Sequence, residues 1–253
     1  MSALFKPNPT LDQLCRFLNS VRGTDKVLML VVYVSKIAIW AISRRNPKSA
    51  AIVRLRNLVA PAADTRMLLR YYGLVPMCQW IVYSEAHPAP TAYLRLLTRL
   101  QNIANIIYYP LEHVYWLGAH GIVPMSSAVR DRVGLWSSRF WALYVILYFA
   151  QLLEEHAMLV SKEMALEKKW NAGPGKKTVD ADAGMAKQQI LVQRVAVWDE
   201  RKTWMINFVI NAAYFPLTIH WSIDNSPFPD IGVGVCGTVA ALAQMYTAWI
   251  ANS

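Results

Sequence analysis

The sequence has few charged residues for its length. Only 17% of its 253 residues are charged, and 55% are hydrophobic, whereas soluble domains usually carry about 25% charged residues. The charges present sum to +10, and ten tryptophans accompany them. This balance is typical of a membrane protein that contacts anionic headgroups. The chain lacks the polar domain with a basic face that nucleic-acid binding requires, so we expect no nucleic-acid partner.

Cysteine is also scarce. Cys15, Cys78 and Cys236 lie far apart in the chain and are odd in number. Such a set excludes a disulfide framework and a C-x-x-C metal knuckle. We therefore expect reduced thiols on a protein that faces the cytosol.

Catalytic signatures are absent as well. The five histidines form no H-E-x-x-H pattern, and the sequence contains neither G-x-S-x-G nor a P-loop. Gly232, Gly234 and Gly237 spell G-x-G-x-x-G. A dinucleotide site needs a strand before these glycines, and here a proline-containing turn precedes them. We therefore predict that the chain is not an enzyme and has no catalytic, cofactor-binding or metal-ligating residues.

Two uncharged apolar runs near the C-terminus, 204–223 and 231–251, dominate the sequence. Each is about 20 residues long, enough for a helix to cross a bilayer. Pro227 and Pro229 separate them and cannot continue a helix. The pattern predicts a transmembrane helical hairpin; the alternative is a soluble pair of helices buried on all sides.

Polar and small residues mark one face on each helix of this hairpin. Small residues allow close helix approach in lipid, and amides bond across the gap. We interpret these faces as packing surfaces rather than a substrate path. The predicted hairpin-packing residues are Asn207, Asn211, Thr218, Gly234, Gly237, Ala241 and Gln244. Arg201 and Lys202 precede the first helix, which places that side, and both termini, in the cytosol.

The sequence pattern of the N-terminal region, 1–83, predicts amphipathic helices. Helices are expected over 10–19 and from about 24 to 42, the second apolar but interrupted by Lys36. Basic and apolar residues alternate at helical spacing over 49–73, where Pro61 is expected to begin a second helix. The predicted membrane-surface residues are Lys48, Arg54, Arg56, Arg66, Arg70, Leu55, Leu58 and Leu69. They would bind anionic lipids; the alternative is an ordinary basic helix packed on its neighbours.

The central region, 91–170, predicts two helices. The first, 91–118, has a polar face, which indicates either an amphipathic surface or bundle helix or the wall of a pore. The second, 126–170, has an apolar centre followed by a charged tail. A flexible linker is expected over 171–184, and a basic helix from about 185 joins the hairpin within 185–253. No strand pattern occurs, so the predicted fold is an all-α membrane protein.

Three stretches resemble the peroxisomal biogenesis factor 11 family in its fungal form. The residues of the opening stretch that fit are Phe17, Leu18, Gly23, Asp25, Lys26, Val27, Tyr33, Ser35 and Lys36. Those of the basic stretch are Arg54, Arg66, Arg70 and Gly73. Those of the C-terminal stretch are Pro216, Leu217, His220, Trp221, Gly232, Gly234, Gly237, Tyr246 and Trp249. Together they extend from Leu11 to Trp249.

This resemblance implies a multi-pass protein of the peroxisomal membrane. Such a protein would elongate and tubulate the organelle before fission by inserting an amphipathic helix into the cytosolic leaflet. The resemblance also implies homo-oligomers and partnership with dynamin-type fission machinery and its adaptors. The alternative role it implies is a pore for small metabolites.

Overall fold

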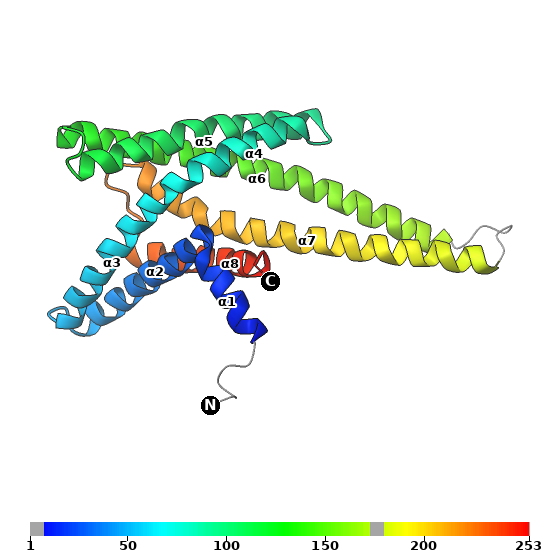
Figure 1. The fold of residues 1–253 in the computed structure, drawn as a ribbon, viewed down its shortest axis with the longest axis horizontal. Coiled ribbons are helices and arrows are strands. Elements are labelled where there is room, and N and C mark those ends of the chain that lie inside the picture. The colour runs from blue at the N-terminus through cyan, green and yellow to red at the C-terminus, as the bar shows by residue number, and fades with distance from the viewer. Residues whose placement is uncertain (1–7, 173–179, 253) are drawn as a thin grey trace. The chain divides into compact units, whose positions relative to one another are not determined.

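The computed structural model describes residues 8–172 and 180–252, and within these ranges it contains helices and no strands (Figure 1). The helices are α1 (Pro9–Asn19), α2 (Val21–Arg45), α3 (Ala50–Leu69), the 3-10 turn η1 (Arg70–Gly73), α4 (Leu74–Ala86), α5 (Ala92–Ala119), α6 (Ser127–Ala172), α7 (Asp180–Ser222) and α8 (Asp230–Ile250). The predicted all-α fold is confirmed. Half of the expected linker 171–184, namely 173–179, lies outside the described residues, and its other residues belong to the end of α6 and the start of α7.

Three helices in the described part of the chain are long and apolar enough to cross a membrane: α2, α6 and α8. The helix α8 is the second helix of the predicted hairpin. The first, 204–223, forms the end of the longer helix α7 and is not among the three. Its two asparagines, together with Pro216 and His220, make it less apolar than α8. The helices α2 and α6 also qualify, although the sequence analysis predicted membrane spans only in the C-terminal hairpin.

Polar caps explain where the first helices begin. The Asn8 side chain accepts hydrogen bonds from the backbone N–H of Thr10 and of Leu11. The Ser20 hydroxyl accepts from the N–H of Gly23, so α2 begins three residues before the expected Thr24. Each cap satisfies an N–H group that has no acceptor within its own helix.

The helix α3 continues through Pro61, contrary to the expectation that this proline would start a new helix. Proline removes one N–H donor, which leaves the carbonyl of Asn57 without its usual partner. Both residues lie on the exposed face of α3. There the carbonyl can bond to solvent instead, so the helix tolerates the proline.

The described chain divides into two compact units. The second is Tyr148–Phe208, and the first comprises the described residues before and after it. In the second unit the end of α6 packs antiparallel to the start of α7. Ion pairs join Lys162 to Glu200 at 2.6 Å and Arg201 to Glu163 at 2.5 Å, and the Trp204 ring N–H donates to the carbonyl of Leu152.

The core of the first unit forms where α2, α3, α7 and α8 meet. The side chains of Met29, Leu217 and Ala240 are fully buried there. The helices α2 and α8 run side by side (Figure 1). They are antiparallel, because Arg22 contacts Thr247 while Ile37 contacts Gly234. The N-terminal end of α2 therefore lies beside the C-terminal end of α8.

The helix α1 extends this contact to the end of the chain. The Arg16 Nε–H donates to the carbonyl of Asn252 at 3.0 Å, and the Gln13 amide donates to the carbonyl of Trp249 at 3.2 Å. The rings of Phe17 and Trp249 meet edge to face, 5.7 Å between centroids. Both ends of the described chain thus lie at the same end of the α2–α8 pair.

Candidate functional site

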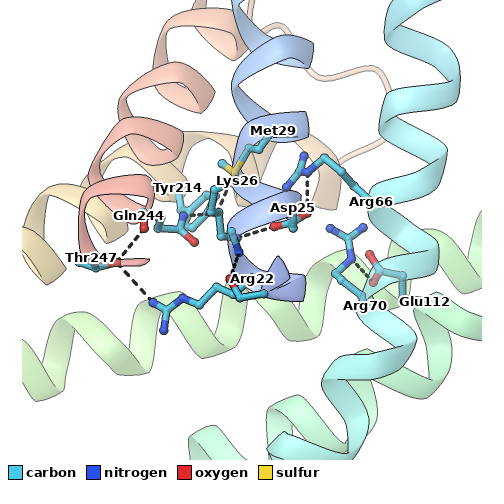
Figure 2. A network of polar contacts seen from close by, with 12 residues as sticks. Arg22, Asp25, Lys26, Met29, Arg66, Arg70, Glu112, Tyr214, Gln244 and Thr247 are labelled. Atoms are coloured by element: carbon cyan, nitrogen blue, oxygen red, sulfur yellow. Dashed lines mark hydrogen bonds and ion pairs between the residues drawn. The ribbon is translucent and has the colours of Figure 1, made fainter. Parts of the chain in front are cut away.

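A network of polar side chains crosses the first unit between five helices (Figure 2). Its centre is Asp25 in α2, whose two oxygens accept from different cations. Arg66 Nε lies 2.9 Å from one oxygen and Lys26 Nζ lies 2.6 Å from the other. All three side chains are only 11–13% exposed. Charged side chains that are this well buried are stable only when they are paired. The ion pair between Asp25 in α2 and Arg66 in α3 therefore holds the two helices together.

A second ion pair joins η1 to α5. Arg70 Nε lies 2.6 Å from Glu112, and the Tyr108 hydroxyl donates to the other oxygen of the same carboxylate at 3.1 Å. Burial alone would lower the pKa of Arg70, but the paired Glu112 carboxylate outweighs burial and raises it. Burial and the nearby Glu112 raise the pKa of Tyr108. Arg70 therefore stays charged and Tyr108 stays neutral at physiological pH.

A third set of contacts joins α7 to α8. The Gln244 amide donates a short hydrogen bond to the Tyr214 hydroxyl, and that hydroxyl lies 3.7 Å from the sulfur of Met29. Figure 2 shows Gln244 and Tyr214 facing each other across the two helices. The two C-terminal helices thus form a contact with each other and with α2.

The structure separates the predicted membrane-surface residues into two groups. Lys48, Arg54, Arg56 and Leu58 are exposed, while Leu55 and Leu69 are half-buried. Arg66 and Arg70 instead serve the internal ion pairs, and Arg66 is only 9% exposed. In this structure the two arginines pair with carboxylates of α2 and α5, and their role at a lipid surface stays a prediction.

The sequence contained a signal for these internal pairs. Asp25 and Glu112 are isolated acidic residues in otherwise apolar or basic surroundings. A buried carboxylate needs a cationic partner, so each should be matched with a lysine or arginine elsewhere. Sequence spacing could not identify that partner, because 41 residues separate Asp25 from Arg66 and 42 separate Arg70 from Glu112.

The predicted hairpin-packing residues also fall into groups that differ in the helix they contact. Gln244 contacts α7 through Tyr214, and Ala241 and Thr218 are fully buried. Gly234 and Gly237 pack against α2 instead, where a Cβ at Gly234 would lie 2.8 Å from a side-chain carbon of Ile37. Asn211 is buried in the first unit, whereas Asn207 is half-buried and belongs to the second. The small-residue face of α8 therefore serves α2 more than its hairpin partner.

The polar face of α5 is largely occupied by contacts within the protein. Asn102 donates to Ser84 in α4, Glu112 binds Arg70, and the Trp116 ring N–H donates to Asp64 in α3. Arg99 forms an exposed ion pair with Glu85. These contacts give the face a packing role within the protein.

His113 lies in the same part of α5 and is 7% exposed. Its ring stacks on Tyr71 with centroids 3.7 Å apart, and its Nε2 is buried without a hydrogen-bond partner. Burial lowers the pKa of His113, although Glu112 opposes this. No three His, Cys, Asp or Glu residues within 8–172 and 180–252 are placed to hold a metal ion.

The helix α4 leaves much of its apolar surface exposed. No residue of α4 is buried, and its sequence LVPMCQWIVYSEA carries a single charge. Val75, Trp80, Val82 and Tyr83 are each more than half exposed. Thirteen residues are too few to cross a bilayer but suit a helix that lies in its interface. The sequence interpretation included residues up to 83 in the N-terminal helical region and did not single out this segment.

A cavity of about 830 Å³ opens beside the Arg66 and Arg70 ion pairs. Residues of α2, α3, α5, the start of α6, the end of α7 and the α7–α8 connection line it, all within the first unit. Aromatic rings form a continuous part of its lining. The ring centroid of Trp141 lies 5.3 Å from that of Tyr214, 5.6 Å from that of Trp221 and 6.3 Å from that of Tyr108.

Comparison with known proteins identifies relatives over most of the chain. The family described as Peroxisomal biogenesis factor 11 (PEX11) matches residues 11–249. An uncharacterized protein of Schizosaccharomyces pombe is 27% identical over 90% of this chain and 88% of its own. Peroxisomal membrane protein 11C of Homo sapiens is 23% identical over 94% of each chain. Peroxisomal membrane protein PMP30A of Candida boidinii is 21% identical over 54% of each. No solved structure matches the chain.

Proposed function

Since this chain belongs to the peroxisomal biogenesis factor 11 family, we propose that it resides in the peroxisomal membrane and elongates and tubulates that membrane ahead of fission. Human and Candida relatives carry the name peroxisomal membrane protein, which supports the location. Three apolar helices in the described chain can anchor it. The observation that carries the remodelling role is the short, uncovered apolar helix α4.

The helix α4 inserts partway into one leaflet. It has no buried residue, so its apolar surface in the free protein faces water unless lipid covers it. The rings of Trp80 and Tyr83 stack at 5.8 Å, and these residue types favour the level of the headgroups. A helix inserted into a single leaflet expands that leaflet. The bilayer then curves so that the expanded leaflet lies on the convex side.

The packing of α3 supports insertion of α4 into the leaflet on the side of the chain termini. Because Arg66 binds Asp25, α3 runs back along α2 and ends near the beginning of α2. The helix α4 follows directly, at the end of the α2–α8 pair where α1 and Asn252 lie. If the termini are cytosolic, as the sequence predicts, α4 enters the cytosolic leaflet.

Two further parts of the proposal concern partners. The exposed basic residues Lys48, Arg54 and Arg56 contact anionic headgroups, which attract lysine and arginine near the bilayer surface. Copies of the chain associate in the membrane, and dynamin-type machinery with its adaptors completes fission. A bilayer wedge acts more strongly when many copies are concentrated together, which is why self-association belongs to the same proposal.

Liposome deformation by the full-length protein tests the role of α4. We expect wild-type protein reconstituted in liposomes with anionic lipid to form tubules, and the double variant Trp80→Glu, Val82→Glu to lose them. Charged side chains at these positions disfavour burial in lipid. The matched control is Ile122→Glu, because Ile122 in the α5–α6 connection is 60% exposed and Trp80 is 57% exposed. Undiminished tubulation by the double variant would remove α4 as the wedge.

A cellular assay extends the test. In cells that lack the endogenous protein, the Ile122→Glu variant should restore normal peroxisome length and number, and the α4 double variant should leave enlarged, undivided peroxisomes. Both variants should remain in the membrane after an alkaline carbonate wash, because neither change touches α2, α6 or α8. Loss of the α4 variant from the membrane would instead make α4 part of the anchor.

A further inference from the structure

The helix α7 has an inner face that packs on α6 within the second unit. Val197 and Trp204 of α7 meet Leu159 and Leu166 of α6 there in an apolar cluster. On each helix the two residues lie one heptad apart, which is the spacing of paired helices in a coiled coil. The inner face of α7 is therefore already occupied.

A second row of residues on α7 follows the same rule and is not covered. Its members recur at alternating intervals of three and four residues, and all are exposed: Gln188, Leu191, Val195, Trp198, Lys202 and Met205. We call this row the outer seam. Its four apolar members are 43–61% exposed. At about 100° of rotation per residue, its centre lies roughly 130° around the helix from Val197 and Trp204, so α6 leaves it open.

Most of the outer seam lies in a charged part of α7. Arg194 and the four consecutive charged residues 199–202 lie on the same turns of the helix as the seam. Ion pairs with α6 bind Glu200 and Arg201. A segment with this many charges is costly to place in hydrocarbon, so lipid tails do not cover the seam from Leu191 to Lys202. An apolar row that stays exposed in water marks a contact with another protein surface.

The charges beside the outer seam match a second copy of the same helix. The spacing places Val195 and Lys202 at heptad positions a, and Leu191, Trp198 and Met205 at positions d. Arg194 then occupies a g position, and Asp199 occupies the e position that follows it. In a parallel, in-register pair, g of one helix faces the following e of the other. Arg194 of each copy would therefore face Asp199 of the other, twice by symmetry.

The polar members of the outer seam are compatible with this pairing. Lys202 Nζ lies 3.3 Å from Asp199 of its own chain and 5.5 Å from the centroid of the Trp198 ring. These contacts offset the repulsion between the two lysines of a pair. A single charged residue at an a position lowers stability but fixes the register of the two helices.

The membrane supplies the parallel orientation. Copies that are inserted in the same direction point their α7 helices the same way. We infer that the outer seam of α7 pairs with the outer seam of a second copy as a parallel coiled coil. The inference rests on the self-association that belongs to the proposed function, and it names the surface through which two copies meet.

Disulfide cross-linking in proteoliposomes tests the pairing. In full-length protein whose three native cysteines are replaced by alanine, Val195→Cys should give at least about fivefold more covalent dimer on oxidation than Ala196→Cys. Ala196 is the control because it is exposed on the adjacent position but lies outside the seam. Leu191→Cys and Met205→Cys should both form dimers, since a parallel pair brings each residue beside its own copy. Equal yields from Val195→Cys and Ala196→Cys would overturn the pairing.

Charge reversal tests that the partner is a second copy. Added to Val195→Cys, Arg194→Glu should lower the dimer yield at least about threefold, because glutamate would then face Asp199 of the other copy. Adding Asp199→Arg as well should restore the yield. Gln193→Glu, an acidic change at an exposed neighbour outside the seam, is the control and should have little effect. A monodisperse elution profile and an unchanged circular dichroism signal confirm folding. No restoration by the double reversal contradicts the assigned register.

These measurements separate the pairing from the remodelling role. If covalent dimers form at the outer seam while wild-type protein leaves liposomes unbent, the pairing stands and the proposed function fails. If no outer-seam dimer forms in liposomes that wild-type protein tubulates, the proposed function stands and the pairing is wrong.

Discussion

Asp25 shows how one residue fixes the arrangement of the N-terminal helices. It accepts from Arg66 and Lys26 in a place where all three side chains are almost covered. An isolated charge there would be strongly destabilising. The carboxylate and its two cations are therefore stable in this position only as a set. The same pairing gives Arg66 a partner within the protein. A residue that resembles a headgroup ligand in the sequence thus has a structural role.

Removal of the Asp25 charge should therefore destabilise the protein strongly. We expect Asp25→Asn to lower the free energy of unfolding by about 3–5 kcal/mol, because it leaves Arg66 and Lys26 buried without a counter-charge. Thermal unfolding in detergent, followed by circular dichroism, measures the effect. Adding Arg66→Met to Asp25→Asn should recover part of the loss. The control Arg54→Met, at an exposed arginine of the same helix, should change stability by less than about 0.5 kcal/mol.

His113 makes the stability depend on pH in a defined direction. Burial lowers its pKa in the folded protein, whereas the unfolded chain keeps a value of about 6.5. Below about pH 6.5 the unfolded state therefore binds more protons, and stability falls as the pH falls further. We expect His113→Gln to flatten the fall in melting temperature between pH 7.5 and pH 5.5. His87→Gln, at an exposed histidine, should leave that slope unchanged.

At the scale of the element, α8 depends on its glycines for contact with α2. A Cβ at Gly237 would collide with the ring of Tyr33, which is itself 6% exposed. The opposite face of α8 is open: Val235, Val239, Leu242 and Tyr246 are each 40–54% exposed. The helix thus has one face for α2 and α7 and another for lipid or a second copy. Mutations on the two faces should have different consequences.

Gly237→Ala should weaken the α2–α8 contact. The added methyl group has no room beside the Tyr33 ring, and overpacking of this kind typically destabilises by about 1–3 kcal/mol. Melting temperature in detergent reports the change, and combining Gly237→Ala with Tyr33→Leu should recover part of it. Val235→Ala, on the open face of α8, is the control and should have little effect. Equal losses for both single variants would argue against a close approach at Gly237.

At the scale of the whole molecule, the antiparallel α2–α8 pair constrains membrane topology. If both helices cross, the α2–α3 connection and the α7–α8 connection emerge on one side, and α1 and Asn252 emerge on the other. This arrangement agrees with termini on a common side. It also places the exposed Lys48 on the side of the hairpin turn, away from α4.

Single-cysteine labelling of sealed proteoliposomes checks this arrangement. In a chain from which Cys15, Cys78 and Cys236 have been replaced by alanine, Ser49→Cys and Ser226→Cys should react with an impermeant maleimide from the same side. Asn252→Cys should react from the opposite side. Labelling of Ser49→Cys and Ser226→Cys from different sides would show that α2 and α8 do not both cross the bilayer as a pair.

Hydropathy and periodicity along the chain were sufficient for the all-α fold, for most helix boundaries and for α8 as a helix long and apolar enough to cross a membrane, because these features depend on neighbours in sequence. Residue motifs were sufficient for the family. The partners of Arg66, Arg70, Gly234 and Gly237 emerged only in three dimensions, since each pairing joins segments far apart in the chain. The cavity and the bare surface of α4 likewise depend on which faces other helices cover, and packing alone decides that.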